Sequence, residues 1–260
     1  NIPANGVLLV RTTVVNDSTY EGAEALQLKV TPTGGTTVYG TATIVDDGTG
    51  NVYPDNTTGN RDPDATLDDD RAIKVNDIDV NERSPYGVFT VTANAGQMVT
   101  LGLQNDSDPA TADATLGVDT GTQLQYYNGS AWVNYVAGTA VAVPASGQMM
   151  VRLSISNGPD YEGPETFQLS VSTSGGLKVY GTATIYDDGT GNIYPNNNTG
   201  NPDPSAIKDD DRAIQVNNIE VNEASPYAVF TVSGAAGQAV NLGLQNDADP
   251  NSADATLGTD

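Results

Sequence analysis

The chain repeats itself at a spacing of 141 residues. Val10-Arg11 recurs as Val151-Arg152, and the run from Val38 to Asn51 recurs from Val179 to Asn192. About three in five aligned positions are identical, so the units are recent tandem copies. A period this long holds enough residues to bury its own core, which predicts one domain per unit. Like domains in series indicate reach, stiffness or multivalency and argue against a single catalytic pocket, so we expect no enzyme.

The charge of the chain limits its partners. Acidic residues number 33 against 10 basic ones, which gives a net charge of -23. Nucleic acids and anionic membranes require clusters of Lys and Arg, so neither is an expected partner. The chain holds no Cys and no His, which excludes disulfides, thiolate metal sites and the usual ligand of zinc. No apolar run approaches the length of a membrane span, so membrane insertion is not expected.

The hydrophobic pattern predicts an all-β fold. Apolar residues alternate or run together over the short segments 148–155, 166–171 and 180–185. Clusters of Gly, Asn, Asp and Pro separate such segments every ten residues or so, which is typical of a sandwich of antiparallel sheets. Residues 124–135 read as a hairpin in which Asn128-Gly129 supplies the two positive-φ residues of a tight turn.

The phase of the repeat places the domain boundaries. A complete sandwich is predicted over 71–188, and residues 1–47 and 212–260 match its second and first halves. The ranges 48–70 and 189–211 are poor in hydrophobic residues and rich in Asn, Asp, Gly, Thr and Pro, which predicts acidic linkers. Each half would expose an apolar face and an unpaired edge. We therefore expect a longer array, in which the partners are neighbouring repeats or complementary half-domains of a homopolymer.

Acidic side chains gather where the predicted strands end. Oxygen-rich clusters without His or Cys suit Ca²⁺, which accepts six to eight oxygen ligands in flexible geometry. The candidate ligands are Asp187 and Asp188 with their copies Asp46 and Asp47, Glu82 with Glu223, Glu162 and Glu165 with Glu21 and Glu24, and Asp113 with Asp254.

A solvated acidic surface is the alternative, because charged runs usually face water. The candidate acids recur in both copies, whereas some neighbouring acids do not. Asp17 becomes Gly158, Asp55 becomes Asn196 and Asp64 becomes Ser205. This selectivity favours a cation site.

Two segments of the chain resemble a known family. The runs from Asp160 to Leu169 and from Gly181 to Gly189 are similar to the second half of a Calx-β domain. The resemblance implies an immunoglobulin-like antiparallel β-sandwich, a module of sodium–calcium exchangers and of arrays in large secreted bacterial adhesins. It also implies calcium at one tip of the sandwich, held in this chain by Glu82, Asp113, Glu162, Glu165, Asp187 and Asp188.

The chain departs from this family at two places. Exchanger domains carry paired acids just before the turn that holds Glu162, where this chain has Asn157-Gly158. The terminal run Asp187-Asp188-Gly189 is one acid shorter. Fewer charges predict fewer or weaker ions, nearer the affinities of extracellular modules than those of cytosolic sensors.

A further acidic run lies between the domains. Asp68, Asp69 and Asp70, which recur as Asp209, Asp210 and Asp211, precede Arg71 and the first strand. The run is expected near the terminal acids of the preceding domain, where a shared calcium would fix the angle between neighbours. A flexible hinge, with Arg71 in an ordinary ion pair, is the alternative.

Together these features predict a calcium-stabilised extender repeat of a giant secreted bacterial adhesin or extracellular filament, located at the bacterial cell surface. One alternative is a self-assembling matrix or sheath filament. Another is a glycan-binding module, in which Trp132 with Tyr126, Tyr127 and Tyr135 would stack on sugar rings. Packing within the core and the hairpin is the competing explanation for these aromatic residues.

Overall fold

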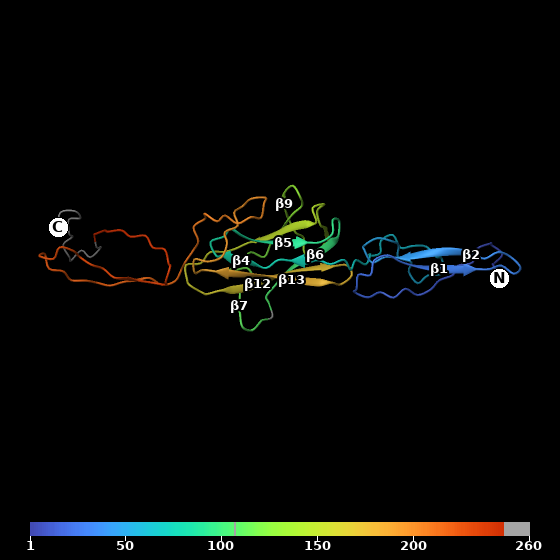
Figure 1. The fold of residues 1–260 in the computed structure, drawn as a ribbon, viewed down its shortest axis with the longest axis horizontal. Coiled ribbons are helices and arrows are strands. Elements are labelled where there is room, and N and C mark those ends of the chain that lie inside the picture. The colour runs from blue at the N-terminus through green and yellow to red at the C-terminus, as the bar shows by residue number, and fades with distance from the viewer. Residues whose placement is uncertain (107, 247–260) are drawn as a thin grey trace.

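The computed structural model describes residues 1–106 and 108–246. Over these residues the chain is all-β, and no helix in this part of the chain is long and apolar enough to cross a membrane. Figure 1 shows a thick central body with a thinner segment at either end along one axis. The central body is formed by residues in the range predicted to hold a complete domain, and the thinner segments by described residues on either side of that range.

The first sheet of the central body carries the strand ends that matter for the site. Its strand order is β10-β6-β12-β13-β4, and β7 lies beside β12. The β4–β13 and β7–β12 pairs are parallel and the others are antiparallel. The strands are β4 (Ile78–Asn81), β6 (Met98–Gln104), β7 (Ala112–Asp113), β10 (Val141–Ala142), β12 (Glu165–Thr173) and β13 (Lys178–Tyr186).

The second sheet is antiparallel throughout, in the order β3-β5-β11-β8-β9. Its strands are β3 (Lys74–Val75), β5 (Tyr86–Thr92), β8 (Gln125–Tyr127), β9 (Trp132–Asn134) and β11 (Gln148–Ser154). The predicted hairpin is β8–β9, but its predicted turn is wrong. Only Gly129 has a positive φ, because Asn128 Oδ1 accepts hydrogen bonds from the backbone of Ser130 and Ala131 and closes a longer loop.

Both sheets contribute side chains to one core. The rings of Phe89 on β5 and Phe167 on β12 meet edge to face with centroids 5.9 Å apart, and both side chains are fully buried. On β12, Leu169 and Val171 follow Phe167 at the two-residue period that places side chains on one face of a strand. The alternation in the sequence therefore sets the face on which the two sheets pack.

The N-terminal segment repeats the local pairing of the central body. β1 (Glu24–Val30) pairs with β2 (Val38–Ile44) in the register of their copies β12 and β13. Leu26, the copy of the buried Phe167, is 38% exposed. At the other end, β14 (Gln215–Val216) pairs with β15 (Val232–Ser233) and leaves Phe230 exposed. Strand pairing therefore forms within each end segment. Burial of the apolar side chains on those strands requires the other half of a sandwich.

Residues 189–208, here called the strap, contact the sandwich where the sequence predicts a linker. Ile193 and Tyr194 of the strap are each only 7% exposed. The backbone N–H of Tyr194 donates to Ser84 Oγ at 2.8 Å, and Trp132 Nε1 donates to the carbonyl of Asn197 at 2.8 Å. Tyr194 belongs to the same apolar core as the strands, so the strap is part of the folded unit.

Candidate metal centre

A small acidic cavity opens at one tip of the central sandwich. Five of its seven lining residues carry carboxylates, in a chain whose net charge is already strongly negative. The cavity is lined by Glu82, Asp119, Glu162, Gly163, Glu165, Ile185 and Asp187.

The sheet topology brings the first two acids together. β4 pairs in parallel with β13, matching Asn81 with Tyr186, so Glu82 and Asp187 leave adjacent strands at the same end. The backbone N–H of Glu82 donates to the carbonyl of Tyr186 at 2.8 Å and fixes this arrangement. Both carboxylates are buried, with residue exposures of 8% and 4%.

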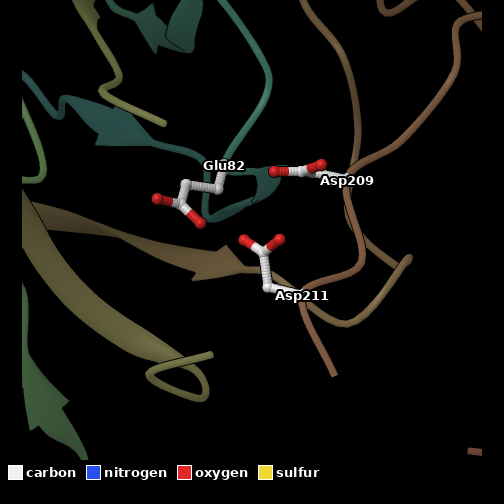
Figure 2. Close-up of side chains that lie close together, drawn as sticks. All are labelled: Glu82, Asp209 and Asp211. Carbon is white, nitrogen blue, oxygen red and sulfur yellow. The ribbon is translucent and has the colours of Figure 1, made fainter. Parts of the chain in front are cut away.

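One group of three carboxylates joins the tip to the inter-repeat segment. Single carboxylate oxygens of Glu82, Asp209 and Asp211 all lie within 4.8 Å of one another. Figure 2 shows the three side chains converging, with Glu82 at the strand end and both Asp residues on the neighbouring loop. The fully buried Asn81 positions this loop, because its Oδ1 accepts from the backbone N–H of Asp209 at 2.8 Å.

A second group lies on the other side of the cavity. Single carboxylate oxygens of Asp119, Glu162 and Glu165 also lie within 4.8 Å of one another. The turn before β12 is held by Asp187, whose Oδ2 accepts from the backbone N–H of Glu162 at 2.6 Å and of Gly163 at 3.2 Å. Asp187 therefore lies between the two groups.

Burial and mutual repulsion raise the pKa of several of these acids. Burial, with the charges of Asp187 and Asp211, raises the pKa of Glu82 to about 6, although a hydrogen bond from the Gly158 backbone opposes the shift. Burial, with the charges of Asp119 and Glu162, raises the pKa of Glu165 to about 7. Carboxylates with raised pKa values bind protons more tightly than solvated ones do.

Three buried carboxylate oxygens at this tip have no hydrogen-bond partner within the described residues. They are Asp187 Oδ1, Asp209 Oδ2 and Asp211 Oδ2. A buried acceptor without a donor is costly, and a cation removes that cost. Carboxylates as the only charged donors, without His or Cys, fit a hard cation such as Ca²⁺.

The structure brings together four of the six acids that the family resemblance implies. Glu82, Glu162, Glu165 and Asp187 line the cavity. Asp113 is exposed on β7 and lies outside both groups. The carboxylate of Asp188 instead accepts hydrogen bonds from the backbone and side chain of Thr190.

Sequence reasoning missed Asp119. This residue ends a turn in which its Oδ2 accepts from the backbone N–H of Thr115 at 2.6 Å, and its carbonyl accepts from Ser156 N at 2.8 Å. The run from Ala112 to Asp119 is nearly unchanged in the second copy, which is the signal that the sequence offered.

In the acidic runs 68–70 and 209–211, the middle residue and the outer residues contact different parts of the chain. The middle residue binds the following repeat, because Arg71 donates to both oxygens of Asp69 at 2.9 and 2.7 Å. Arg212 and Asp210 repeat this pair at 2.8 and 2.7 Å. Among the predicted metal ligands, Asp69 and Asp210 are therefore ion-pair partners of arginine.

The outer residues of the run face the preceding repeat. The backbone N–H of Asp70 donates to the carbonyl of Asp46 at 2.9 Å, just as that of Asp211 donates to Asp187 at 2.8 Å. Asp70 is 5% exposed, and its pKa is raised by burial and then by Asp68 and Asp46. Asp46 Oδ1 and Asp70 Oδ1 are buried without a hydrogen-bond partner in the described part of the chain.

The following repeat closes the other side of this junction. A Cβ added to Gly175, in the turn between β12 and β13, would lie 2.2 Å from Asp70 Oδ1 and 2.7 Å from Asp68 Oδ1. Only glycine leaves room for the acids at this point. Asp70 therefore lies in contact with chain segments on both sides of this junction.

The remaining predicted ligands lie in the end segments. Asp46 Oδ2 accepts from the Glu21 backbone at 2.7 Å, which repeats the bond between Asp187 and Glu162. Asp47 caps Thr49, while Glu24 and Glu223 are exposed. The predicted ligand Asp254 lies outside the described residues.

The aromatic cluster around Trp132 packs within the domain. The Arg152 guanidinium lies 3.9 Å from the ring centroid of Tyr86 and 4.0 Å from that of Trp132. Tyr127 meets Trp132 edge to face at 5.5 Å. Tyr135 is buried, and its hydroxyl donates to the carbonyl of Thr139 at 2.7 Å. Packing accounts for the positions of these rings.

Comparisons with known proteins leave the family open. No family model matches the chain, and no curated protein matches it. Among solved structures, the apo-form Calx CBD1 domain is 12% identical with a TM-score of 0.28, over 45% of this chain and 97% of that one. CBD12 from CALX1.2 is 13% identical with a TM-score of 0.27, over 44% of this chain and 42% of that one.

A third similar structure is a Bacteroides ovatus GH5 xyloglucanase, 11% identical with a TM-score of 0.27. The match covers 44% of this chain and 19% of the xyloglucanase chain, so this chain spans a small part of that enzyme. At such TM-scores these similarities carry no conclusion about function.

Proposed function

We propose that these residues form part of a calcium-stabilised array of β-sandwich repeats. The array would act as the extender of a giant secreted bacterial surface adhesin or of an extracellular filament. The observation that supports this proposal most is the acidic cavity, where the buried Asp187 keeps one oxygen without a partner among the described residues. Serial sandwiches set distance and stiffness, so the role is mechanical rather than catalytic.

The geometry suggests which residues would hold the cation. Glu82, Asp209 and Asp211 would take one side of the cavity, with Asp187 beside them. Asp119, Glu162 and Glu165 would take the other side. Calcium suits this set better than magnesium, because it accepts more oxygens in less regular geometry. A bound cation would neutralise acids that otherwise repel one another.

Cation binding would stabilise the folded array. A ligand that binds only the folded form adds about 2.7 kcal/mol per site at a hundredfold excess over its Kd. Asp209 and Asp211 belong to the connection toward the next repeat, so the same ion would also fix the angle between neighbours. Asp68 and Asp70 would play this part at the preceding junction.

The neighbouring repeats are the proposed partners of the two end segments. The exposed apolar side chains of the N-terminal segment, such as Leu26 and Leu28, are copies of the buried Phe167 and Leu169. Their complement is a segment like 212–260, supplied by the same polypeptide or by a second copy in a filament. Such a contact would reproduce the core of the central sandwich.

The test is to remove the cation and measure stability and length. Metal analysis after buffer exchange, with and without EGTA, should find bound calcium that the chelator removes. EGTA should also lower the melting temperature and shorten the particle in X-ray scattering. Magnesium at equal concentration is the control and should restore little of either quantity. A melting temperature and scattering profile unchanged by EGTA would contradict the proposal.

A further inference from the structure

The strap begins and ends at the metal centre. Gly189 N–H donates to the carbonyl of Asp209 at 2.8 Å, and Asp211 N–H donates to the carbonyl of Asp187 at 2.8 Å. The two ends therefore run antiparallel beside the cavity, where Asp209 and Asp211 meet Glu82 (Figure 2). Because both ends of the strap lie at one acidic site, a change in the charge of that site affects whether the strap stays closed.

The acids at the strap ends repel one another when no cation is bound. Burial raises the pKa of Asp211, and the charges of Asp209 and Asp187 raise it further. Asp209 Oδ2 and Asp211 Oδ2 are buried and have no hydrogen-bond partner in the described residues. Backbone hydrogen bonds, the Asn81 side chain and the ion pair between Arg212 and Asp210 oppose this repulsion at the strap ends.

The middle of the strap covers the aromatic cluster. Trp132 Nε1 donates to the carbonyl of Asn197, and Arg152 Nη1 donates to Asn196 Oδ1 at 2.9 Å. Asn196 and Asn198 are exposed, so these contacts lie at the edge of the domain and not in its core. Release of the strap ends would bare Trp132 and Tyr194 to water.

We propose that the strap is latched by the cation, so that binding at the tip closes residues 189–208 over Trp132 and cation loss releases them. The inference rests on the proposed calcium site and adds a regulated surface to it. In the closed state the strap shields a cationic and aromatic patch made by Arg152, Trp132 and Tyr86. In the open state that patch faces solvent.

The single tryptophan of the chain makes the latch measurable. The full 260-residue chain is titrated with calcium chloride by calorimetry, while Trp132 emission and amide exchange of residues 190–204 are followed. We expect EGTA to shift Trp132 emission to the red and to raise exchange over the strap by about tenfold or more, the signature of local opening. Calcium should reverse both changes.

Two variants separate the latch from a general loss of stability. Asp209→Asn with Asp211→Asn removes the repulsion, so the strap should stay closed in EGTA and respond little to calcium. Asp203→Asn is the control, because Asp203 lies in the strap away from the cavity and its oxygen, which Asn retains, accepts from Ser205. This variant should respond as the unmodified chain does.

The outcomes distinguish the two proposals. Calcium binding in calorimetry with unchanged Trp132 emission and unchanged strap exchange would overturn the latch and leave the calcium site standing. A double variant that opens in EGTA as the unmodified chain does would overturn repulsion as the cause. Absence of calcium binding would overturn the calcium site and the latch together.

Discussion

The side chain of Asn81 binds the backbone of Asp209 in both directions. Its Oδ1 accepts from the Asp209 N–H at 2.8 Å, and its Nδ2 donates to the Asp209 carbonyl at 3.1 Å. The same Nδ2 also donates to the carbonyls of Tyr186 and Thr190. One buried amide thus joins the end of β4, the end of β13 and both ends of the strap.

Replacing this amide should destabilise the central domain. Asn81→Ala removes the partner of the part-buried Asp209 N–H and leaves a gap at a fully buried position, and we expect a loss of about 2–4 kcal/mol in the free energy of unfolding. Urea unfolding followed by Trp132 emission measures it. The control is Asn222→Ala, the exposed copy in the C-terminal segment, which should change stability by less than about 0.5 kcal/mol. Equal effects of the two substitutions would contradict the role of Asn81.

The stability of the calcium-free chain should fall as pH rises. The folded-state pKa values of about 6 for Glu82 and about 7 for Glu165 lie above the ordinary value of 4.5. The folded state then binds protons more tightly than the unfolded state, so this contribution is complete below about pH 4.5 and is lost as pH rises through the folded-state pKa values of about 6 and about 7. Melting temperatures measured in EGTA across this range should fall.

The same pH series has an internal control. Glu165→Gln should flatten the fall between pH 6 and 7, whereas Glu24→Gln, at the exposed copy of Glu165, should not. Calcium should also reduce the fall in melting temperature with pH, because a bound cation neutralises the carboxylates that protons neutralise at lower pH. A melting temperature that rises over this range in EGTA would be inconsistent with buried acids of raised pKa.

Truncation of the side chain should cost much more stability at Phe167 than at its copy Leu26. Phe167→Ala removes a fully buried ring in contact with Phe89, and we expect a loss of about 3–5 kcal/mol. Leu26→Ala changes the copy of Phe167 on the exposed face of β1 and should cost under about 1 kcal/mol. Urea unfolding followed by Trp132 emission compares the two. Similar losses would mean that the N-terminal face is covered in solution.

A charge at Asn196 should tighten the strap. In the N-terminal copy Arg11 forms an ion pair with Asp55, whereas in the central domain Arg152 meets the neutral Asn196. Arg152 is buried, so Asn196→Asp should stabilise the domain by about 1 kcal/mol through a charge-assisted hydrogen bond. The reciprocal Asp55→Asn affects an exposed pair and should change little. A lower melting temperature in Asn196→Asp would refute this reading of the contact.

The sequence predicted the all-β fold and the position of most acids because these follow from local pattern. Alternation along β12 sets which side chains face the core, and the strand ends place Glu82 and Asp187. The strap was predicted as a linker because its composition is polar. Its contact with the sandwich depends on Ile193 and Tyr194, two residues whose burial requires the folded sheets.

The local sequence pattern also did not show which of two neighbouring acids faces the cavity. Asp69 and Asp70 are adjacent in sequence, yet one pairs with Arg71 and the other turns toward Asp46. Asp113 matched a family position, but Asp119, six residues later, is the acid that reaches the cavity. Which acid faces the site is decided by turn geometry, which composition and spacing do not report.

The closed base of the strap has a mechanical consequence. In the proposed array, a tensile load would pass from the end of β13 to Asp210 and Asp211 through the bridge between Asp188 and Asp210. The strap lies outside this direct path, held to the sandwich by Ile193, Tyr194 and its hydrogen bonds to Ser84 and Trp132. Rupture of this base, followed by detachment of Ile193 and Tyr194 from the sandwich, would lengthen the chain by roughly 70 Å of extended backbone. If the proposed cation binds at this tip, it would raise the force needed to open the base of the strap.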